Sequence, residues 1–274
     1  MAARLSALDI LTKGKDWSPD ESSLIVLVGD DPFLARHVLG LIRVALCPDE
    51  ADWVWAWREF SAADELDPRD VFDEAATVPL FAGATRAAVV RDADAFVSAA
   101  RERLEAIAQA SRGQRGVVIL DVKSFPATTR LAKAAAQSGL VIDIAVPPKA
   151  DVVRWLRGWA KTQHGIELAA ATAQQLLDRL GNSLGQVDQA LRRLAAAIDP
   201  AARKKSVPPE WIDDIVASSQ EKTAWGMIDA AATGQTPAAL TLLAELLEAG
   251  ENPIGIGAQM TSVLRRVSSA ARLL

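Results

Sequence analysis

The sequence predicts an α/β domain with a mainly parallel sheet, followed by two regions built from helices. Two observations carry this fold class. Short apolar runs alternate with amphipathic helical patterns as far as Pro147-Pro148, and beyond that dipeptide the strand signals stop. The chain has 274 residues, more than one domain of average size needs. We therefore predict three domains, over residues 1–147, 148–217 and 218–274.

The predicted strands are short apolar runs that end in turn residues. Leu24–Val28 ends in Gly29-Asp-Asp-Pro32, a sequence that closes a strand and starts a helix. Asp30 or Asp31 can cap that helix, and Pro32 suits its first turn. Further strands are predicted near residues 53–57, 86–90, 117–122 and 140–144, and helices near 33–45, 96–109 and 129–137, with another beginning near Pro68.

Three tryptophans alternate with small residues in one of these predicted strands. Trp53, Trp55 and Trp57 are separated by Val54 and Ala56, so in an extended strand the three indoles share one face. Packing inside the domain is the interpretation that strand propensity favours. Stacking on nucleic-acid bases is the alternative.

Helices account for the rest of the chain. Those near residues 151–163, 172–180, 184–198 and 209–216 are joined by short turns and predict a small bundle. A second break around residues 218–222 precedes helices near 224–232, 237–249 and 253–274.

Composition and charge narrow the classes of function. The net charge of −5 argues against a protein whose whole surface neutralises phosphates, so any DNA contact is expected to be shared with partners. Arg203-Lys-Lys205 is either a solvated loop or a local backbone contact. Cys47 is the single cysteine, which leaves no intramolecular disulfide. No apolar run nears the roughly 20 residues that cross a bilayer, and no signal peptide is evident, so we expect a cytoplasmic protein without membrane contact.

A working phosphate loop is missing after the first strand. Such a loop needs glycines, a lysine and a hydroxyl group for phosphates and magnesium. Gly29-Asp-Asp-Pro-Phe-Leu-Ala-Arg36 lacks the second glycine, the lysine and the hydroxyl, and places two carboxylates where phosphate would lie. Asp121 resembles a magnesium-positioning aspartate at a later strand end, but no glutamate follows it. We predict neither nucleotide binding nor ATP hydrolysis.

Other catalytic constellations are weak. His37 and His164 have no nucleophile motif nearby, so structural or exposed roles are favoured. Asp92 and Asp94 follow a strand, where carboxylates either make turn and cap hydrogen bonds or hold a metal; capping is the favoured interpretation. We therefore predict no catalytic residue, no metal site and no cofactor.

An apolar corner follows the helix that begins near Pro68. Val78, Leu80 and Phe81 surround Pro79 in the segment Ala76-Thr-Val-Pro-Leu-Phe-Ala-Gly83. A leucine and a phenylalanine on a rigid corner suit a hydrophobic pocket on a partner, because a few buried apolar groups dominate interface energies. Inward packing beneath the sheet is the alternative that composition leaves open.

The order of these motifs resembles the delta subunit of bacterial DNA polymerase III, a clamp-loader family with an AAA+-like domain, a helical lid and a helical collar. The resemblance spans the whole chain and rests on these fragments: Leu27-Val-Gly-Asp-Asp-Pro-Phe33, Val78-Pro-Leu-Phe81, Val89-Val-Arg-Asp-Ala-Asp94, Gly181-Asn-Ser-Leu184 with Val187–Leu194, and Trp225-Gly-Met-Ile-Asp-Ala230 ahead of residues 238–253. The family does not keep a working phosphate loop.

This resemblance implies a function and a set of partners. Leu80 and Phe81, with Val78 and Pro79, are expected to enter a hydrophobic pocket of the sliding clamp and help open it for loading on primed DNA. Motor subunits and a delta-prime-like subunit are expected to bind through the collar. No intrinsic active site is expected, although the holoenzyme is a DNA-directed DNA polymerase.

Two other functions remain open, and the sequence departs from the delta family in one respect. A delta-prime-like scaffold would lack hydrolysis and need no clamp plug, and an ATP-hydrolysing AAA+ motor would need the nucleotide site that Gly29–Arg36 does not provide. Delta subunits continue through more collar helices, whereas this sequence ends at Arg272-Leu-Leu274, so a shortened collar is expected.

Overall fold

The protein divides into two compact units, Met1–Val146 and Pro147–Leu274. The computed structural model describes residues 4–19, 21–62, 66–78, 84–110, 113, 116–181, 183–198, 207–208, 211–212, 226–248, 253, 256–257 and 260–261. The predicted boundary at residue 217 lies outside these residues. The three-domain organisation therefore stays a prediction.

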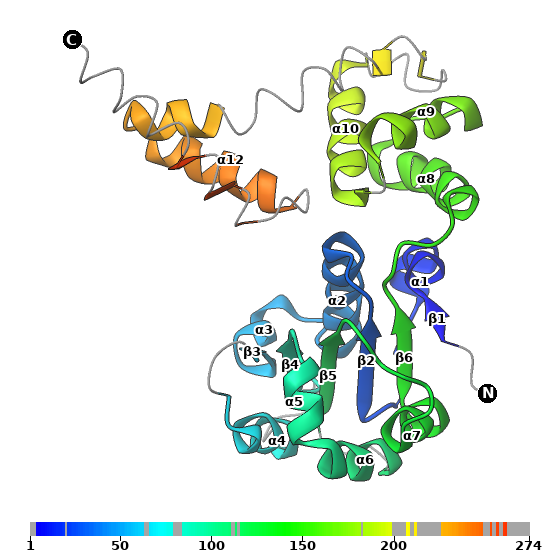
Figure 1. The fold of residues 1–274 in the computed structure, drawn as a ribbon, viewed down its shortest axis with the longest axis vertical. Coiled ribbons are helices and arrows are strands. Elements are labelled where there is room, and N and C mark those ends of the chain that lie inside the picture. The colour runs from blue at the N-terminus through cyan, green and yellow to red at the C-terminus, as the bar shows by residue number, and fades with distance from the viewer. Residues whose placement is uncertain are drawn as a thin grey trace. The chain divides into compact units, whose positions relative to one another are not determined.

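The first unit is built on a six-stranded sheet whose neighbouring strands are all parallel within the described residues (Figure 1). The strands lie in the order β1-β6-β2-β5-β4-β3. Their bounds are β1 Leu5–Ser6, β2 Leu24–Val28, β3 Trp57–Ser61, β4 Ala87–Arg91, β5 Val117–Val122 and β6 Leu140–Asp143. The predicted α/β fold with a mainly parallel sheet is confirmed.

Helices connect the strands and cover both faces of the sheet. Their bounds are α1 Ala7–Lys13, α2 Pro32–Leu46, α3 Trp53–Ala56, α4 Pro68–Ala76, α5 Asp94–Ala99, α6 Arg101–Gln109 and α7 Arg130–Ser138, with 3₁₀ turns η1 Gly14–Asp16 and η2 Glu50–Asp52. One continuous helix is predicted where α5 and α6 lie. They are separated at Ala100, whose φ of −109° and ψ of 16° interrupt the helical path.

A continuous core joins one face of the sheet to α4, α5, α6 and α7. Alternate β2 residues, including Leu24 and Val26, pack there with Phe72 of α4, Phe96 of α5 and Leu104 of α6. Strand side chains alternate between faces, so the other β2 residues point to the opposite face, where they are also fully buried. Burial on both faces explains the unbroken apolar runs by which the sequence predicts these strands.

The predicted tryptophan strand is wrong. Asp49 accepts a hydrogen bond from Ala51 N at 2.9 Å and starts a helical turn that runs through η2 into α3. The indole of Trp53 donates to Cys47 O at 2.9 Å and that of Trp55 to Asp52 Oδ1 at 3.1 Å. These local partners stabilise a turn that alternation cannot reveal, so β3 begins only at Trp57.

The second unit begins with three helices, α8 Lys149–His164, α9 Ala170–Leu180 and α10 Leu184–Ala197, that pack on one another. Buried side chains recur at helical spacing on each, for example Leu156 on α8, Leu176 on α9 and Leu191 on α10. Further along, residues 226–232 are helical and α12 spans Thr236–Glu248. A smaller core joins Met227 and Ile228 to Leu246.

Within the described part of the chain, none of the helices combines the length and hydropathy that a bilayer crossing requires.

Candidate functional site

The loop after β2 is the place where a phosphate loop would lie, and side-chain and backbone contacts already fill it. Gly29 N donates to Val122 O at 3.0 Å. A Cβ at Gly29 would lie 2.4 Å from Ala145 N, so the backbone of this loop is pressed against the segment after β6. Such a close approach leaves no open cradle of backbone amides at this glycine.

Asp31 caps α2 from the same loop. Its Oδ1 accepts a hydrogen bond from Leu34 N at 2.7 Å, and its side chain is buried. Burial raises the pKa of the Asp31 carboxyl above its ordinary value, against the opposing hydrogen bonds from the Leu34 and Phe33 amides. The carboxylate therefore occupies the helix N-terminus to which a phosphate would bind.

The acidic residues at the ends of β4 and β5 are tied into hydrogen bonds and an ion pair. Asp94 accepts from Lys123 N and Ser124 N, both at 3.1 Å, and Arg91 Nε lies 3.2 Å from Asp121 Oδ2. Burial raises the pKa of Asp121, while Arg91 lowers it. No group of three or more potential metal ligands occurs among the described residues. Hydrogen bonding of loops is the role that this geometry supports for Asp94.

His37 and the cysteine have structural contacts. His37 Nδ1 lies 2.9 Å from Phe33 O, and the two rings are 4.1 Å apart. Burial raises the pKa of the Cys47 thiol to about 11, which keeps it protonated at neutral pH. Neither residue is placed as a nucleophile or a base by these contacts.

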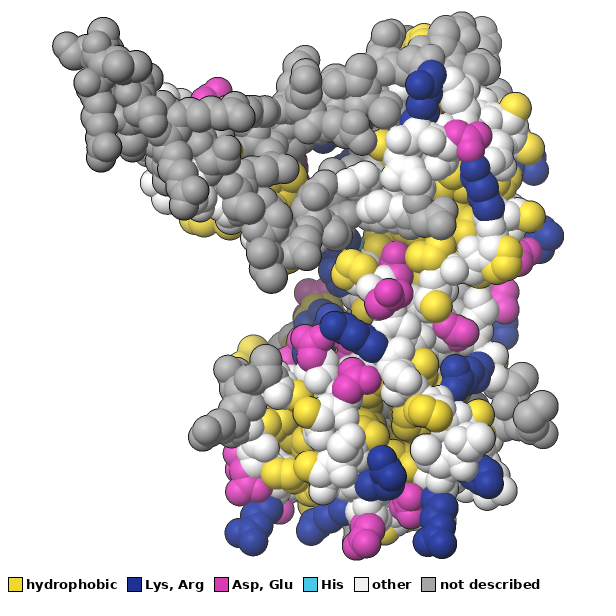
Figure 2. All heavy atoms as spheres, in the orientation of Figure 1, with side chains coloured by type: hydrophobic (Ala, Val, Ile, Leu, Met, Phe, Trp, Pro, Cys, Tyr) yellow, Lys and Arg dark blue, Asp and Glu magenta, His cyan; other side chains and the backbone are white. Residues whose placement is uncertain are grey.

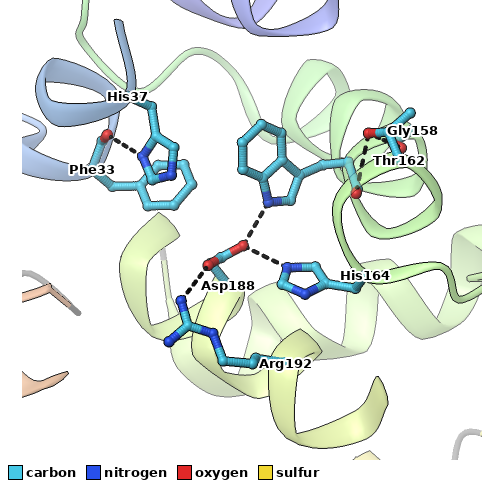
Figure 3. A network of polar contacts seen from close by, with 8 residues as sticks. Phe33, His37, Gly158, Thr162, His164, Asp188 and Arg192 are labelled. Carbon is cyan, nitrogen blue, oxygen red and sulfur yellow. Dashed lines mark hydrogen bonds and ion pairs between the residues drawn. The ribbon is translucent and has the colours of Figure 1, made fainter. Parts of the chain in front are cut away.

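His164 belongs to a buried polar network within the second unit (Figure 3). Asp188 Oδ1 lies 2.7 Å from His164 Nε2 and accepts a hydrogen bond from Trp159 Nε1 at 2.6 Å. Arg192 Nη2 lies 3.9 Å from the other carboxylate oxygen. The network links α8 to α10 and has the character of a structural connection.

Replacing Asp188 with alanine is expected to lower the free energy of unfolding by about 2 kcal/mol, because buried donors on Trp159 and His164 lose their acceptor. Urea unfolding followed by tryptophan fluorescence measures this change. Asp178→Ala is the matched control, since Asp178 is exposed on α9 and is expected to leave the midpoint unchanged. Equal midpoints for Asp188→Ala and wild type would contradict the stabilising role.

The predicted apolar corner follows α4, which ends at Ala76. Val78 is 48% exposed, whereas Pro79, Leu80 and Phe81 lie outside the described residues. Thr77 ends α4 by donating from its amide and its hydroxyl to Asp73 O. Among the four predicted contact residues, the structure therefore places Val78 alone.

Ion pairs fix the end of α4 beside the corner. Glu74 Oε1 lies 2.9 Å from Arg86 Nε, and Glu74 Oε2 lies 3.2 Å from Arg58 Nη1. Arg86 Nη2 also donates to Trp55 O at 2.8 Å, and Gly116 N donates to Ala75 O at 2.8 Å. Sequence reasoning missed this network because its partners are distant along the chain and have no recurring spacing.

The segment that follows the corner is fixed to the amino edge of the sheet. Thr85 N donates to Leu46 O at 2.9 Å, and the Cys47 thiol donates to Thr85 O at 3.3 Å. Both flanks of residues 79–83 are thus bound to the amino edge of the sheet. This arrangement can present an apolar corner from a fixed base, and the blocked phosphate loop lies at the carboxyl edge.

No protein-family model and no curated protein matches the sequence. Among solved structures, the Bacillus subtilis DNA clamp loader delta protein is similar with a TM-score of 0.61 and 19% sequence identity, over 94% of this chain and 76% of that one. The chain shares the fold of this delta protein. The α/β fold with a mainly parallel sheet that the sequence predicts is thus also found in a solved structure.

Two further structures are less similar. The Thermotoga maritima RuvB Holliday junction branch migration motor has a TM-score of 0.43 and 10% identity, over 82% of this chain and 72% of that chain. Domain III of the Thermotoga maritima replication initiation protein DnaA has a TM-score of 0.41 and 16% identity, over 78% of this chain and 90% of that chain.

Proposed function

We propose that this chain is a clamp-loader subunit of the delta type, which binds and helps open a sliding clamp without hydrolysing ATP itself. The observation that carries the proposal is the likeness to a clamp loader delta protein across 94% of the chain, both units included. The motifs that resemble the delta family in sequence add support, because they follow the same order along the chain.

The proposed clamp contact is the corner formed by Val78, Pro79, Leu80 and Phe81. Support comes from the exposed Val78 side chain and from the ion pairs and hydrogen bonds that fix the residues on both sides of the corner. A fixed base reduces the conformational entropy lost when apolar side chains enter a pocket. The corner would then favour an open clamp only if it binds that state more tightly than the closed one.

ATP-dependent control would come from partner subunits. The loop after β2 supports the proposal that partner subunits bind ATP in place of this chain, because Asp31 caps α2 and Gly29 is pressed against Ala145. Partner contact through the second unit is supported by α12, where Leu240 and Leu247 are exposed at a spacing of seven residues, two helical turns apart. Motor and delta-prime-like subunits are the proposed partners of this collar surface.

DNA contact is proposed to be shared within the assembled complex. Figure 2 shows Lys and Arg side chains interspersed with Asp and Glu over the visible described surface of the first unit. The formal net charge of −5 agrees with that mixed pattern. Neither feature favours strong DNA binding by the isolated chain.

The purified chain is expected to bind magnesium-ATP with a dissociation constant above about 1 mM, because the phosphate loop lacks its lysine and carries two carboxylates. Isothermal titration calorimetry measures this affinity, with a known ATP-hydrolysing clamp-loader motor subunit as the positive control. A micromolar dissociation constant would instead favour an ATP-dependent motor.

Clamp binding by the isolated chain is the experiment that tests the function. A delta-type subunit binds the clamp alone, whereas a delta-prime-like scaffold need not.

A further inference from the structure

Two neighbouring apolar side chains on α3 are exposed. Val54 is 92% exposed and Trp55 is 38% exposed. Trp57, three residues after Val54, is buried. The exposed pair, hereafter the α3 surface, is therefore available for contact with another molecule.

The α3 surface is connected to the base of the corner by direct contacts. Arg86 Nη2 donates to the carbonyl oxygen of Trp55, and its guanidinium lies 5.9 Å from the centre of the Trp55 ring. Arg86 also pairs with Glu74, which precedes Val78 by four residues in the last turn of α4. Through Arg86 and Glu74, these contacts connect the α3 surface to the end of α4, after which the corner begins, within the first unit.

The corner alone is too small for a stable protein interface. Specific interfaces usually bury about 800 Å² and about 20–30 residues on each partner, whereas the corner has four residues. A partner seated on it must therefore contact neighbouring surface as well. Tryptophan is enriched among the residues that dominate binding energies, and Trp55 is the exposed tryptophan that these contacts connect to the end of α4.

We propose that the α3 surface is a second contact for the sliding clamp, beside the pocket contact made by the corner. This inference rests on the proposed function and adds a part of the partner-binding surface. Its occupant is an apolar strip of the clamp next to the clamp's hydrophobic pocket. Contact at both the corner and the α3 surface would also fix the angle at which the clamp is held.

Clamp affinity of two single variants tests the inference. Val54→Asp is expected to weaken binding of the purified chain to its cognate clamp about tenfold, because a charge would be desolvated in the interface. Trp55→Ala is expected to weaken it about thirtyfold. The alanine variant keeps the backbone carbonyl that Arg86 binds, so the hydrogen bond between Arg86 and α3 is retained.

Matched controls separate a local effect from effects on charge and folding. Ala171→Asp adds the same charge at an exposed site of α9 in the second unit, and Leu5→Ala truncates a 37% exposed side chain on β1, the strand at the sheet edge opposite β3. Both controls are expected to bind within twofold of wild type. Circular dichroism and the urea midpoint check that each variant is folded.

The outcomes distinguish this inference from the proposed function. If wild type binds the clamp but both α3 variants stay within twofold of it, the α3 contact is overturned and clamp binding stands. If Ala171→Asp weakens binding as much as Val54→Asp, net charge explains the loss and the α3 contact is overturned. If folded wild type does not bind the clamp, both proposals fail.

Discussion

Replacing Leu80 and Phe81 together with alanine is expected to weaken binding of the purified chain to its cognate sliding clamp about a thousandfold. Two interface hot spots worth about 2 kcal/mol each give roughly this factor, although such effects are not strictly additive. Surface plasmon resonance with immobilised clamp measures the change. The loss is expected mainly in the dissociation rate, since mutations in one interface change association rates less.

A double truncation in the second unit provides the matched control. Leu240→Ala with Leu247→Ala removes two exposed leucines from α12 and is expected to leave clamp affinity unchanged. If the corner variant binds as tightly as wild type, clamp binding stands but its site lies elsewhere. If folded wild type does not bind, the clamp-binding role is wrong and the scaffold alternative is favoured.

The sequence predicts much of the sheet because its central strands are buried on both faces. Val117–Val122 is a strand with the predicted bounds, since an apolar run between turn residues reports burial directly. The start of α2 is predicted in the same way, because Asp31, one of the two predicted capping residues, accepts a hydrogen bond from the amide of Leu34.

Elements that depend on distant strand pairing or on local side-chain hydrogen bonds are not predicted. β1 has only two residues and is defined by the pairing of Leu5 with Ile142 of β6. No periodic pattern in the sequence can therefore predict it. Alternation of tryptophans with small residues predicts a strand where α3 lies, because the pattern does not take account of the Asp49 cap and the indole hydrogen bonds that stabilise a turn. Local propensity therefore fails where a side chain finds a backbone partner nearby.

The candidate site shows the same division. The corner of Val78–Phe81 could be selected from an apolar cluster around a proline and from a family resemblance. The base that holds it could not, because Glu74, Arg86 and Arg58 meet only after α4, β4 and β3 have assembled. Sequence thus indicates residues suited to binding a partner, while their support is a property of the tertiary structure.

Gly29→Ala is expected to destabilise the first unit by about 4 kcal/mol, the largest effect on folding expected of any variant considered. Gly29 has a φ of 145°, which residues with a Cβ rarely adopt, and the new methyl would lie 2.4 Å from Ala145 N and 2.6 Å from the carbonyl carbon of Ile144. Relief requires backbone movement, because Ile144 N is hydrogen-bonded to Val28 O at 2.8 Å. Guanidinium unfolding followed by circular dichroism measures the loss.

Gly40→Ala is the matched control for this variant. Gly40 lies within α2, and a Cβ there would meet nothing within 4 Å, so alanine is expected to stabilise the protein by about 0.5–1 kcal/mol. The same substitution should therefore have opposite signs at two glycines of one strand-turn-helix unit. Equal stability of Gly29→Ala and wild type would mean that the backbone at Gly29 is not closely packed, and would leave the Asp31 cap of α2 as the structural argument against ATP binding.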